Sequence, residues 1–224
     1  MDNALTRAPL FEALDDEAAE ALRDTMVEVT FTKGQEIFRE GDPGDRLYVV
    51  LDGKVKLGVT SPDGRENLLG VQGPGEMFGE LSLFDPVPRT ATATAVTDCR
   101  LMGLGHQDLH TWLTGRPVLA QALLQALARR LRRTNDAMGD LVFSDVPGRV
   151  AKALLDLSER FGIDKPTGRH VTHDLTQEEL AQLVGASRET VNKALADFAT
   201  RGWILLEPRG VTILDADKLV RRAA

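Results

Sequence analysis

Turn signals recur at short intervals between residues 27 and 105, and this spacing constrains the fold more than any other feature of the chain. Val27, Val29 and Phe31 alternate with polar residues, which is the spacing of a half-buried strand. Further short apolar runs follow at intervals of about ten residues, separated by glycine and proline. These runs are 47–51, 55–59, 68–71, 90–96 and 100–104. The pattern predicts an antiparallel β-sandwich or barrel.

Helical patterns flank this β region. Residues 4–25 are rich in alanine and leucine and predict one or two short helices. Residues 106–114 predict another short helix, which Gly115-Arg116-Pro117 would end. A long helix is then expected from Val118 to Phe143.

One apolar stripe of this long helix has the spacing of a coiled-coil seam, with alternating steps of three and four residues. Its members are Leu124, Leu127, Leu131, Thr134, Met138 and Leu141. The stripe could pack on the chain's own barrel, but Leu119 and Leu123 already offer a second apolar flank for that purpose. We therefore predict a parallel homodimer seam. Thr134 and its neighbour Asn135 are polar in this setting, which suggests a role in ligand contact or register.

The segment after the long helix predicts a break and a new helix. Asp145 is a suitable N-cap, and the helix that it opens should run to Phe161. Residues 162–169 are polar and contain Pro166, so we expect a loop there. The resulting organisation is three parts, residues 1–115, 116–143 and 144–224.

Residues 79–90 combine features that suit an anion with one carboxylate that does not. Gly79 lets backbone N–H groups approach a ligand, and the N-terminus of a short helix would attract negative charge. Arg89 offers a planar fork of donors for a phosphate, and Thr90 offers a hydroxyl. Glu80 would instead accept from a donor such as a sugar hydroxyl. The stretch predicts a sugar-phosphate site; the alternative is a β-turn with a surface ion pair.

Residues 174–200 predict two short helices joined by a glycine turn. Thr176 and Glu179 have the spacing of a capping box, and Gly185 should end the first helix. Ser187 should cap the second helix, which makes the unit a helix-turn-helix. A hairpin over residues 203–214 would add a wing.

The second of these helices exposes side chains that could read DNA in the major groove. Arg188 can give two hydrogen bonds to guanine, and Glu189 can accept from cytosine. The other candidates are Gln177, Ser187 and Thr190 for phosphates, and Asn192 and Lys193 on the same exposed face. The alternative is a solvated charged face on an ordinary helical hairpin.

Charge and cysteine content narrow the function classes. A net charge of −7 argues against a wholly basic nucleic-acid binder, yet residues 147–224 hold 12 Lys and Arg against 11 Asp and Glu. Cys99 is the only cysteine, which excludes an intrachain disulfide and fits a reducing cytoplasm. The chain shows no signal peptide and no apolar run near the roughly 20 residues of a membrane span. We expect a cytoplasmic protein without a membrane partner.

Three motifs together resemble the bacterial cyclic-AMP receptor proteins, within the cyclic-AMP receptor/fumarate-nitrate regulator family of transcription factors. They are Phe78–Ser82 with Arg89-Thr90, Arg129–Leu131 leading to Thr134-Asn135, and Gly185–Val191. The chain is most similar to the actinobacterial branch. The resemblance implies an α+β fold with an N-terminal, jelly-roll-like antiparallel β-roll that binds cyclic AMP, a long dimerisation helix and a C-terminal winged helix-turn-helix.

The resemblance also implies residue roles. Glu80 would bond the ribose 2′-hydroxyl, and Arg89 and Thr90 would bind the cyclic phosphate. Thr134 would meet the adenine from its own subunit and Asn135 from the partner subunit. The backbone at Gly79, Leu81 and Ser82 would help to hold the phosphate and ribose. Cyclic AMP would then bias the packing of the seam helices, and with it the spacing of the DNA-reading helices.

Further expectations concern partners. A homodimer would bind a palindromic site in double-stranded DNA, and RNA polymerase would be a partner. No metal and no enzymatic activity are expected. Some relatives hold a second, weaker nucleotide, which here would lie near Arg65, Glu66, Gln177 and Arg188.

Two departures from the family pattern bear on function. Many relatives carry serine where this chain has Asn135, which affects how strongly the nucleotide controls DNA binding. Many have a second base-reading arginine where this chain has Lys193, which lacks the bidentate fork.

Alternative functions stay open from the sequence. The chain could sense another ligand, such as haem ligated by His106 and His110, or bind DNA largely independently of nucleotide. A metal-dependent cupin is a further alternative, but cupin chemistry needs a histidine cluster inside the barrel. The first histidine here, His106, follows the last expected strand.

Overall fold

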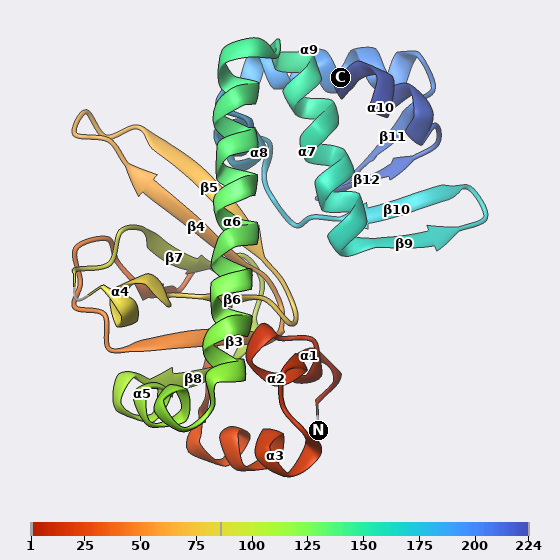
Figure 1. Ribbon diagram of the computed structural model, residues 1–224. Coiled ribbons are helices and arrows are strands. Elements are labelled where there is room, and N and C mark those ends of the chain that lie inside the picture. The colour runs from red at the N-terminus through yellow and green to blue at the C-terminus, as the bar shows by residue number, and fades with distance from the viewer. Residues whose placement is uncertain (1, 86, 224) are drawn as a thin grey trace. The chain divides into compact units, whose positions relative to one another are not determined.

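The computed structural model describes residues 2–85 and 87–223, so Pro86, in the loop 79–90, lies outside the described residues. The chain divides into two compact units (Figure 1). The first unit comprises residues 1–59 and 69–133, and the second comprises 60–68 and 134–224. The expected α+β class, with antiparallel sheets, a long helix and a C-terminal helix-turn-helix, is confirmed.

Three short helices open the first unit, so the expectation of one or two was wrong. Asp2 and Asp15 each cap a helix with their side chains, and Pro9 begins the helix between them. These local signals divide an alanine-rich stretch that composition alone describes as continuous. The helices are α1 (Asn3–Thr6), α2 (Pro9–Glu12) and α3 (Asp16–Thr25).

Two four-stranded antiparallel sheets form the β-roll, in the orders β1-β8-β3-β6 and β2-β7-β4-β5. All the expected strands are present. β2 and β6 were missed because runs of two or three residues are too short to show alternation. The strands are β1 (Val27–Phe31), β2 (Glu36–Phe38), β3 (Arg46–Asp52), β4 (Val55–Thr60), β5 (Glu66–Gln72), β6 (Met77–Phe78), β7 (Thr92–Ala95) and β8 (Cys99–Gly105).

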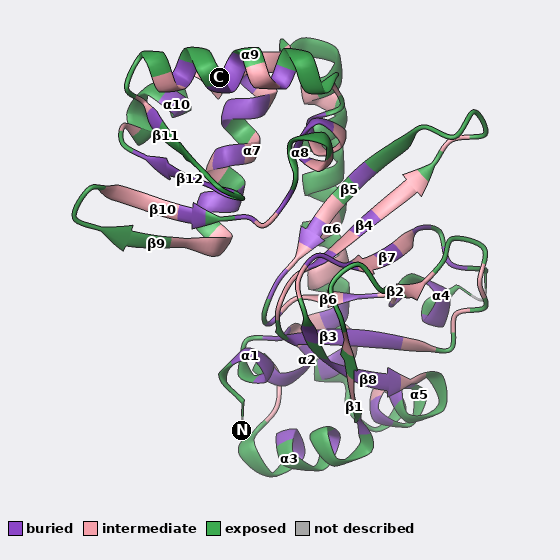
Figure 2. Ribbon diagram, turned by 180° about the vertical axis from the view of Figure 1, so that it is seen from behind, coloured by how far each residue is buried: buried purple, intermediate pink, exposed green. Residues whose placement is uncertain are grey.

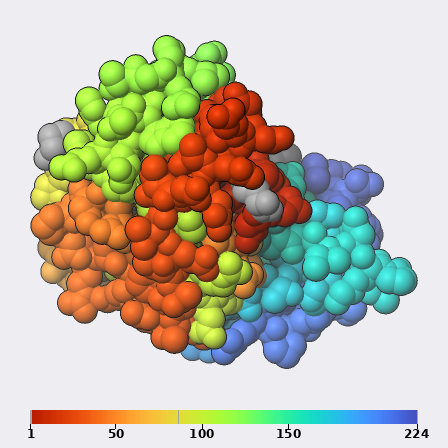
Figure 3. Space-filling model, turned by 90° about the horizontal axis from the view of Figure 1, so that it is seen from below, coloured from red at the N-terminus to blue at the C-terminus, as the bar shows by residue number. Residues whose placement is uncertain are grey.

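Two hydrophobic clusters stabilise this unit. One lies inside the roll, where Tyr48, Phe78 and Leu101 pack together. The other joins strands β3 and β8 to the N-terminal helices, α5 (His106–Gly115) and the start of α6 (Pro117–Phe143). Figure 3 shows the N-terminal helices, in red, beside the green segment that includes α5. The packing explains why so many small apolar residues precede the first strand.

Helix α6 has the length expected from the sequence, and its two apolar flanks differ in burial. Leu119 and Leu123 are fully buried against the first unit. The stripe with coiled-coil spacing is largely exposed in the single chain, including Leu124, Leu131 and Met138. A stripe of large exposed apolar side chains is the pattern of a surface that a partner covers.

Helix α7 (Val146–Phe161) begins at the predicted cap. The Asp145 side chain accepts from the Gly148 N–H at 2.9 Å. Arg222, on the C-terminal helix α10 (Ala216–Ala223), also donates to both oxygens of Asp145, at 2.8 and 2.6 Å. The start of α7 is thus joined to the end of the chain within the second unit.

Residues 162–169 contradict the prediction of a loop. They contain β9 (Gly162–Lys165) and the start of β10 (Gly168–Thr172), which pair as an antiparallel hairpin. The strands were missed because β9 is exposed, polar and followed by Pro166, so no alternation marks it. β10 is held by pairing with a strand about 40 residues later in the chain, which is a non-local contact.

The helix-turn-helix has the predicted local signals. Thr176 and Glu179 form the capping box that opens α8 (Gln177–Val184), and Gly185 ends it with a φ of +64°. Ser187 caps α9 (Arg188–Thr200) by accepting from the Thr190 N–H. Buried and exposed residues alternate along α9 (Figure 2), as expected for a helix with one face on a core. The buried residues are Leu180, Ala181, Val184, Val191, Ala194, Leu195 and Phe198.

The expected wing is present. Strands β11 (Ile204–Glu207) and β12 (Gly210–Ile213) form a hairpin in a sheet of order β11-β12-β10-β9. Arg209, at the turn, has a φ of +59°, and its carbonyl accepts from the Asp174 N–H at 2.9 Å. A non-glycine residue in this region is strained, so the bond from Asp174 helps to keep the wing turn in place. No helix among the described residues is both long and apolar enough to cross a bilayer.

Arg222→Ala should lower the stability of the second unit at neutral pH by less than about 1 kcal/mol, because an exposed ion pair is screened by water and salt. The pKa of Asp145 lies below its usual range, chiefly because of the Arg222 hydrogen bond and then the Gly148 N–H. A carboxylate with a lowered folded-state pKa stabilises the fold above its unfolded pKa of about 4, and loses this contribution as the pH falls through the folded value.

Urea unfolding of wild type and Arg222→Ala across this pH range measures the effect. The difference in the free energy of unfolding should shrink progressively as the pH falls below about 4. A difference that grew on acidification would contradict the role given to this ion pair.

Candidate functional site

The loop after β6 is shaped by Gly79, which has a φ of +79°. A Cβ at this position would lie 2.9 Å from Nη1 of Arg89, so glycine is needed both for conformation and for space. A four-residue helix, α4 (Leu81–Phe84), follows, with Leu81 exposed and Ser82 buried. Gly44, which the sequence marks only as part of a turn, approaches closely here: its Cβ would lie 2.1 Å from that of Ser82.

Arg89 is buried beneath this loop, with only 4% of its surface exposed. Its Nη1 donates to the Gly79 carbonyl at 2.6 Å, and its Nη2 donates to the Arg46 carbonyl at 2.7 Å. The guanidinium also lies over the Phe38 ring, 4.1 Å from the centroid. Burial lowers the pKa of Arg89, yet an arginine keeps its charge in proteins. Its Nε is buried and has no hydrogen-bond partner among the described residues.

Glu80 is also buried, with 1% of its surface exposed. Its Oε1 accepts from Nη1 of Arg130, on α6, at 2.7 Å. Its Oε2 is buried and unpartnered among the residues that the structure describes. Arg130 was noted in the sequence only as part of an arginine-rich motif and was not predicted as a site residue. The 50 positions that separate it from Glu80 hide the contact from any local pattern.

The loop therefore brings together a buried donor and a buried acceptor that have no partner in residues 2–85 and 87–223. A buried polar group without a partner is costly, and a ligand that supplied the missing bonds would remove this cost. The Arg89 Nε suits an anionic oxygen, and the Glu80 Oε2 suits a hydroxyl donor. This combination fits the sugar phosphate expected from the sequence better than a surface ion pair.

The remaining predicted ligand contacts are not brought into this cluster. Thr90 is exposed beside Arg89. Thr134 and Asn135 are exposed on α6 and belong to the second unit. Their contacts with a nucleotide stay predictions.

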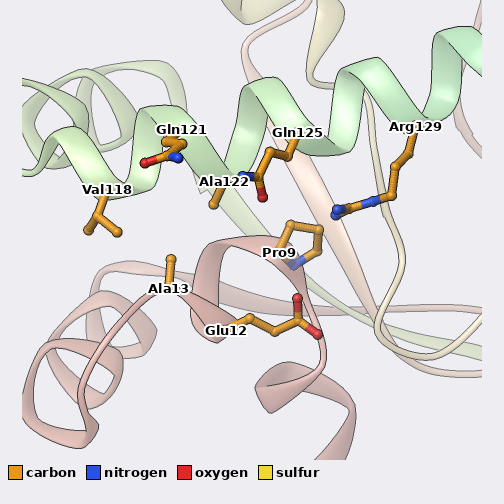
Figure 4. A pocket seen from close by; sticks show the side chains of 8 residues that line it. All are labelled: Pro9, Glu12, Ala13, Val118, Gln121, Ala122, Gln125 and Arg129. Carbon is orange, nitrogen blue, oxygen red and sulfur yellow. The ribbon is translucent and has the colours of Figure 1, made fainter.

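A surface groove between α2 and α6 is a separate feature. Side chains of the two helices face each other across it (Figure 4), with Glu12 on one side and Arg129 on the other. None of the predicted ligand-binding residues lines the groove. It is therefore distinct from the cluster around Arg89.

Most of the residues that the sequence predicts to contact DNA lie on the exposed face of α9. Arg188, Glu189 and Lys193 are exposed, and Glu189 pairs with Lys193 at 2.8 Å. Because Glu189 and Lys193 are paired here, both would have to change partners to reach base edges. Gln177 is exposed at the start of α8.

Three further polar residues, in α9 and at its cap, were also predicted to contact DNA, and they differ in exposure. Ser187 and Thr190 are exposed, and their hydroxyls lie 2.9 Å apart. Asn192 departs from the expectation of an exposed side chain, since it is half-buried and its Oδ1 is covered and has no hydrogen-bond partner within the described part of the chain. One helical position away from the buried Val191, it lies at the edge of the exposed face and not on it.

The residues named for the haem, metal and second-nucleotide alternatives are also described by the structure. His106 and His110 are both exposed on α5. Across residues 2–85 and 87–223, no group of three His, Cys, Asp or Glu side chains is arranged to hold a metal ion. Glu66 accepts a long hydrogen bond from Gln182 of α8 at 3.4 Å, and Arg65 pairs with Asp63.

Comparison with known proteins assigns both parts of the chain. Residues 28–115 match the family described as "Cyclic nucleotide-binding domain", and residues 148–222 match the "Crp-like helix-turn-helix domain". The "CRP-like cAMP-activated global transcriptional regulator" of Mycobacterium tuberculosis is 56% identical over the full length of both chains.

A second relative and a solved structure are also similar to this chain. The "Cyclic AMP receptor protein" of Thermus thermophilus is 37% identical, covering 93% of this chain and 94% of its own. The solved structure of FixK2 from Bradyrhizobium japonicum has a TM-score of 0.82 and covers 89% of this chain and 98% of its own; at 23% identity it bears on the fold alone. With the motifs, the fold and these similarities, the chain belongs to the cyclic-AMP receptor/fumarate-nitrate regulator family of transcription factors.

Proposed function

We propose that the protein is a cyclic-AMP-responsive, DNA-binding transcription regulator that acts as a homodimer on palindromic promoter sites. The observation that carries this proposal is the pair of buried atoms, Arg89 Nε and Glu80 Oε2, that lack partners among the described residues. The same chain has a helix-turn-helix whose second helix, α9, exposes charged side chains. The names of the relatives from M. tuberculosis and T. thermophilus refer to cyclic AMP, which agrees with the chemistry of this pair.

The ligand contacts are those that the family resemblance implies, and the same pair agrees with them. The cyclic phosphate is bound by Arg89, with a hydroxyl from Thr90, and the ribose 2′-hydroxyl donates to Glu80. Backbone groups at Gly79, Leu81 and Ser82 hold the phosphate and ribose. Because Nη1 and Nη2 of Arg89 are already fixed by carbonyls, the guanidinium is oriented before the ligand arrives.

The dimer forms through the exposed stripe of α6, where each helix covers the apolar side chains of the other. Thr134 meets the adenine from its own subunit and Asn135 from the partner subunit. A nucleotide that contacts both helices stabilises one of their arrangements over another, which is what a ligand-controlled switch requires.

The DNA contacts come from α9, with additional phosphate contacts from Gln177, Ser187 and Thr190. In the dimer, two copies of α9 enter successive major grooves, so the half-sites lie about one helical turn apart. Asn192 lies at the edge of the exposed face of α9, and Lys193 lies on that face. Lys193 gives a looser base preference than an arginine would, because it lacks the bidentate fork. RNA polymerase is the expected protein partner. The protein is not an enzyme, and its location is the cytoplasm, where its DNA target lies.

A DNA titration tests the function. A labelled palindrome of the TGTGA–TCACA type is titrated with protein at one fixed salt concentration, without nucleotide, with cyclic AMP and with cyclic GMP. Binding should tighten with cyclic AMP alone. In Arg89→Leu, which loses the charge-assisted phosphate contact, the response to cyclic AMP should disappear.

Thermal unfolding of Arg89→Leu serves as the control, because two carbonyls lose their donor in this variant. A folded Arg89→Leu that binds cyclic AMP with wild-type affinity would refute the assignment of the pocket. Equally tight DNA binding in all three conditions would refute nucleotide control but leave DNA recognition standing.

Arg188→Ala should weaken binding to the correct site by about 1–3 kcal/mol and flatten the preference at one base pair, because a bidentate contact with guanine is lost. Binding to a panel of single-base-substituted palindromes measures this. A uniform loss over all sequences would instead make Arg188 a phosphate contact.

Arg130→Leu should destabilise the ligand-free protein by about 3 kcal/mol, because Glu80 would be left as a buried, unpaired charge. The same substitution in a Glu80→Gln background should cost less than about 1 kcal/mol, since no charge is stranded there. Urea unfolding of the four proteins at pH 7 gives both costs. Equal costs in the two backgrounds would show that the ion pair does not form in solution.

A further inference from the structure

One arginine in the second unit holds the ends of two helices. Arg149 lies in the first turn of α7 and is half-buried. Its Nη1 donates to the Ser144 carbonyl, just beyond the last residue of α6, at 2.7 Å. Its Nε donates to the Val184 carbonyl at 2.8 Å, and its Nη2 to the Gly185 carbonyl at 3.2 Å, both at the end of α8.

These carbonyls are ones that a helix end leaves without a donor. The last carbonyls of a helix have no intrahelical partner, and a cation near them is favourable. At the end of α8, the N–H groups of Gly185 and Ala186 return to the carbonyls of Ala181 and Gln182. The Val184 and Gly185 carbonyls lie further along and accept from Arg149.

Other contacts make the same connection. Lys152 pairs with Asp140 at 2.6 Å, which joins α7 to the last turns of α6. A Cβ on Gly185 would lie 2.8 Å from Cδ2 of Leu141, so the turn before α9 lies directly against a residue of the α6 stripe. The end of α6 and the turn of the helix-turn-helix are therefore one packed assembly.

The position of this turn decides where α9 begins. Gly185 precedes the Ser187 cap by two residues, and Arg188 is the first residue of α9. We propose that Arg149 is a positioning residue for DNA reading: its guanidinium fixes the turn before α9 to the end of α6, so that movement of α6 reaches Arg188. The inference rests on the proposed role of α9 as the DNA-reading helix.

The test compares Arg149→Gln and Arg149→Lys with the matched control Arg160→Gln, which changes an arginine of the same helix that pairs with Asp156. Cyclic-AMP affinity is measured by calorimetry, and DNA affinity by fluorescence anisotropy with and without cyclic AMP. The ratio of the two DNA affinities reports the coupling.

Arg149→Gln should lower this ratio by about tenfold, with cyclic-AMP affinity unchanged. Arg149→Lys should be intermediate, because an ammonium keeps the charge but cannot reach three carbonyls as the planar fork does. Arg160→Gln should match wild type. A merely structural role would lower the folded fraction, and would weaken DNA binding equally with and without nucleotide.

Base discrimination gives a second readout that does not depend on cyclic AMP. The preference for the correct palindrome over one substituted at the pair read by Arg188 should fall in Arg149→Gln. Wild-type coupling and wild-type discrimination in this variant would overturn the inference, as would the same losses in Arg160→Gln. A wild-type protein that ignores cyclic AMP would instead count against the proposed function, and discrimination would then decide the role of Arg149 alone.

Discussion

The burial of the Arg89 guanidinium is the constraint on which the β-roll site depends. A charge removed from water must be surrounded by partners, and here two backbone carbonyls and the face of Phe38 supply them. This arrangement requires the left-handed Gly79 and the close approach of the loop to Arg46. These contacts hold the guanidinium in place without any ligand, so under the proposed function Arg89 is oriented before an anion binds.

The pairing of Glu80 with Arg130 extends this principle from the loop to α6. One carboxylate oxygen is neutralised by the helix, and the other is left for a donor. Under the proposed function, a ligand hydroxyl that donates to Glu80 would join a bond network that already includes α6, and hydrogen bonds linked in a buried site strengthen one another. Within the first unit, the Glu80–Arg130 bond connects the site directly to the long helix α6. A change in the bonding of Glu80 can therefore act on the helix through Arg130.

Local features of the fold could be predicted from the sequence, and non-local ones could not. The caps at Asp145, Thr176 and Ser187 each join residues three positions apart, and all are present. The β9–β10 hairpin was missed because β9 shows no alternation and β10 is held by pairing with the distant strand β12. At the site, Glu80 and Arg89 were predicted from their chemistry. Arg130 was not, since a partner 50 residues away leaves no trace in spacing.

The three-carbonyl contact of Arg149 has a consequence for how this chain can vary. Connections between helices usually tolerate insertions, because loop closure costs little more as a loop lengthens. The connection between α6 and α7 is different, since Arg149 joins α7 to Ser144 at the start of the connection and Lys152 joins it to Asp140 in α6. An added residue would move these groups apart by up to about 3.5 Å, more than a hydrogen bond can span. Arg149 contacts the backbone carbonyl of Ser144, so the Ser144 side chain can change while the number of residues in the connection cannot.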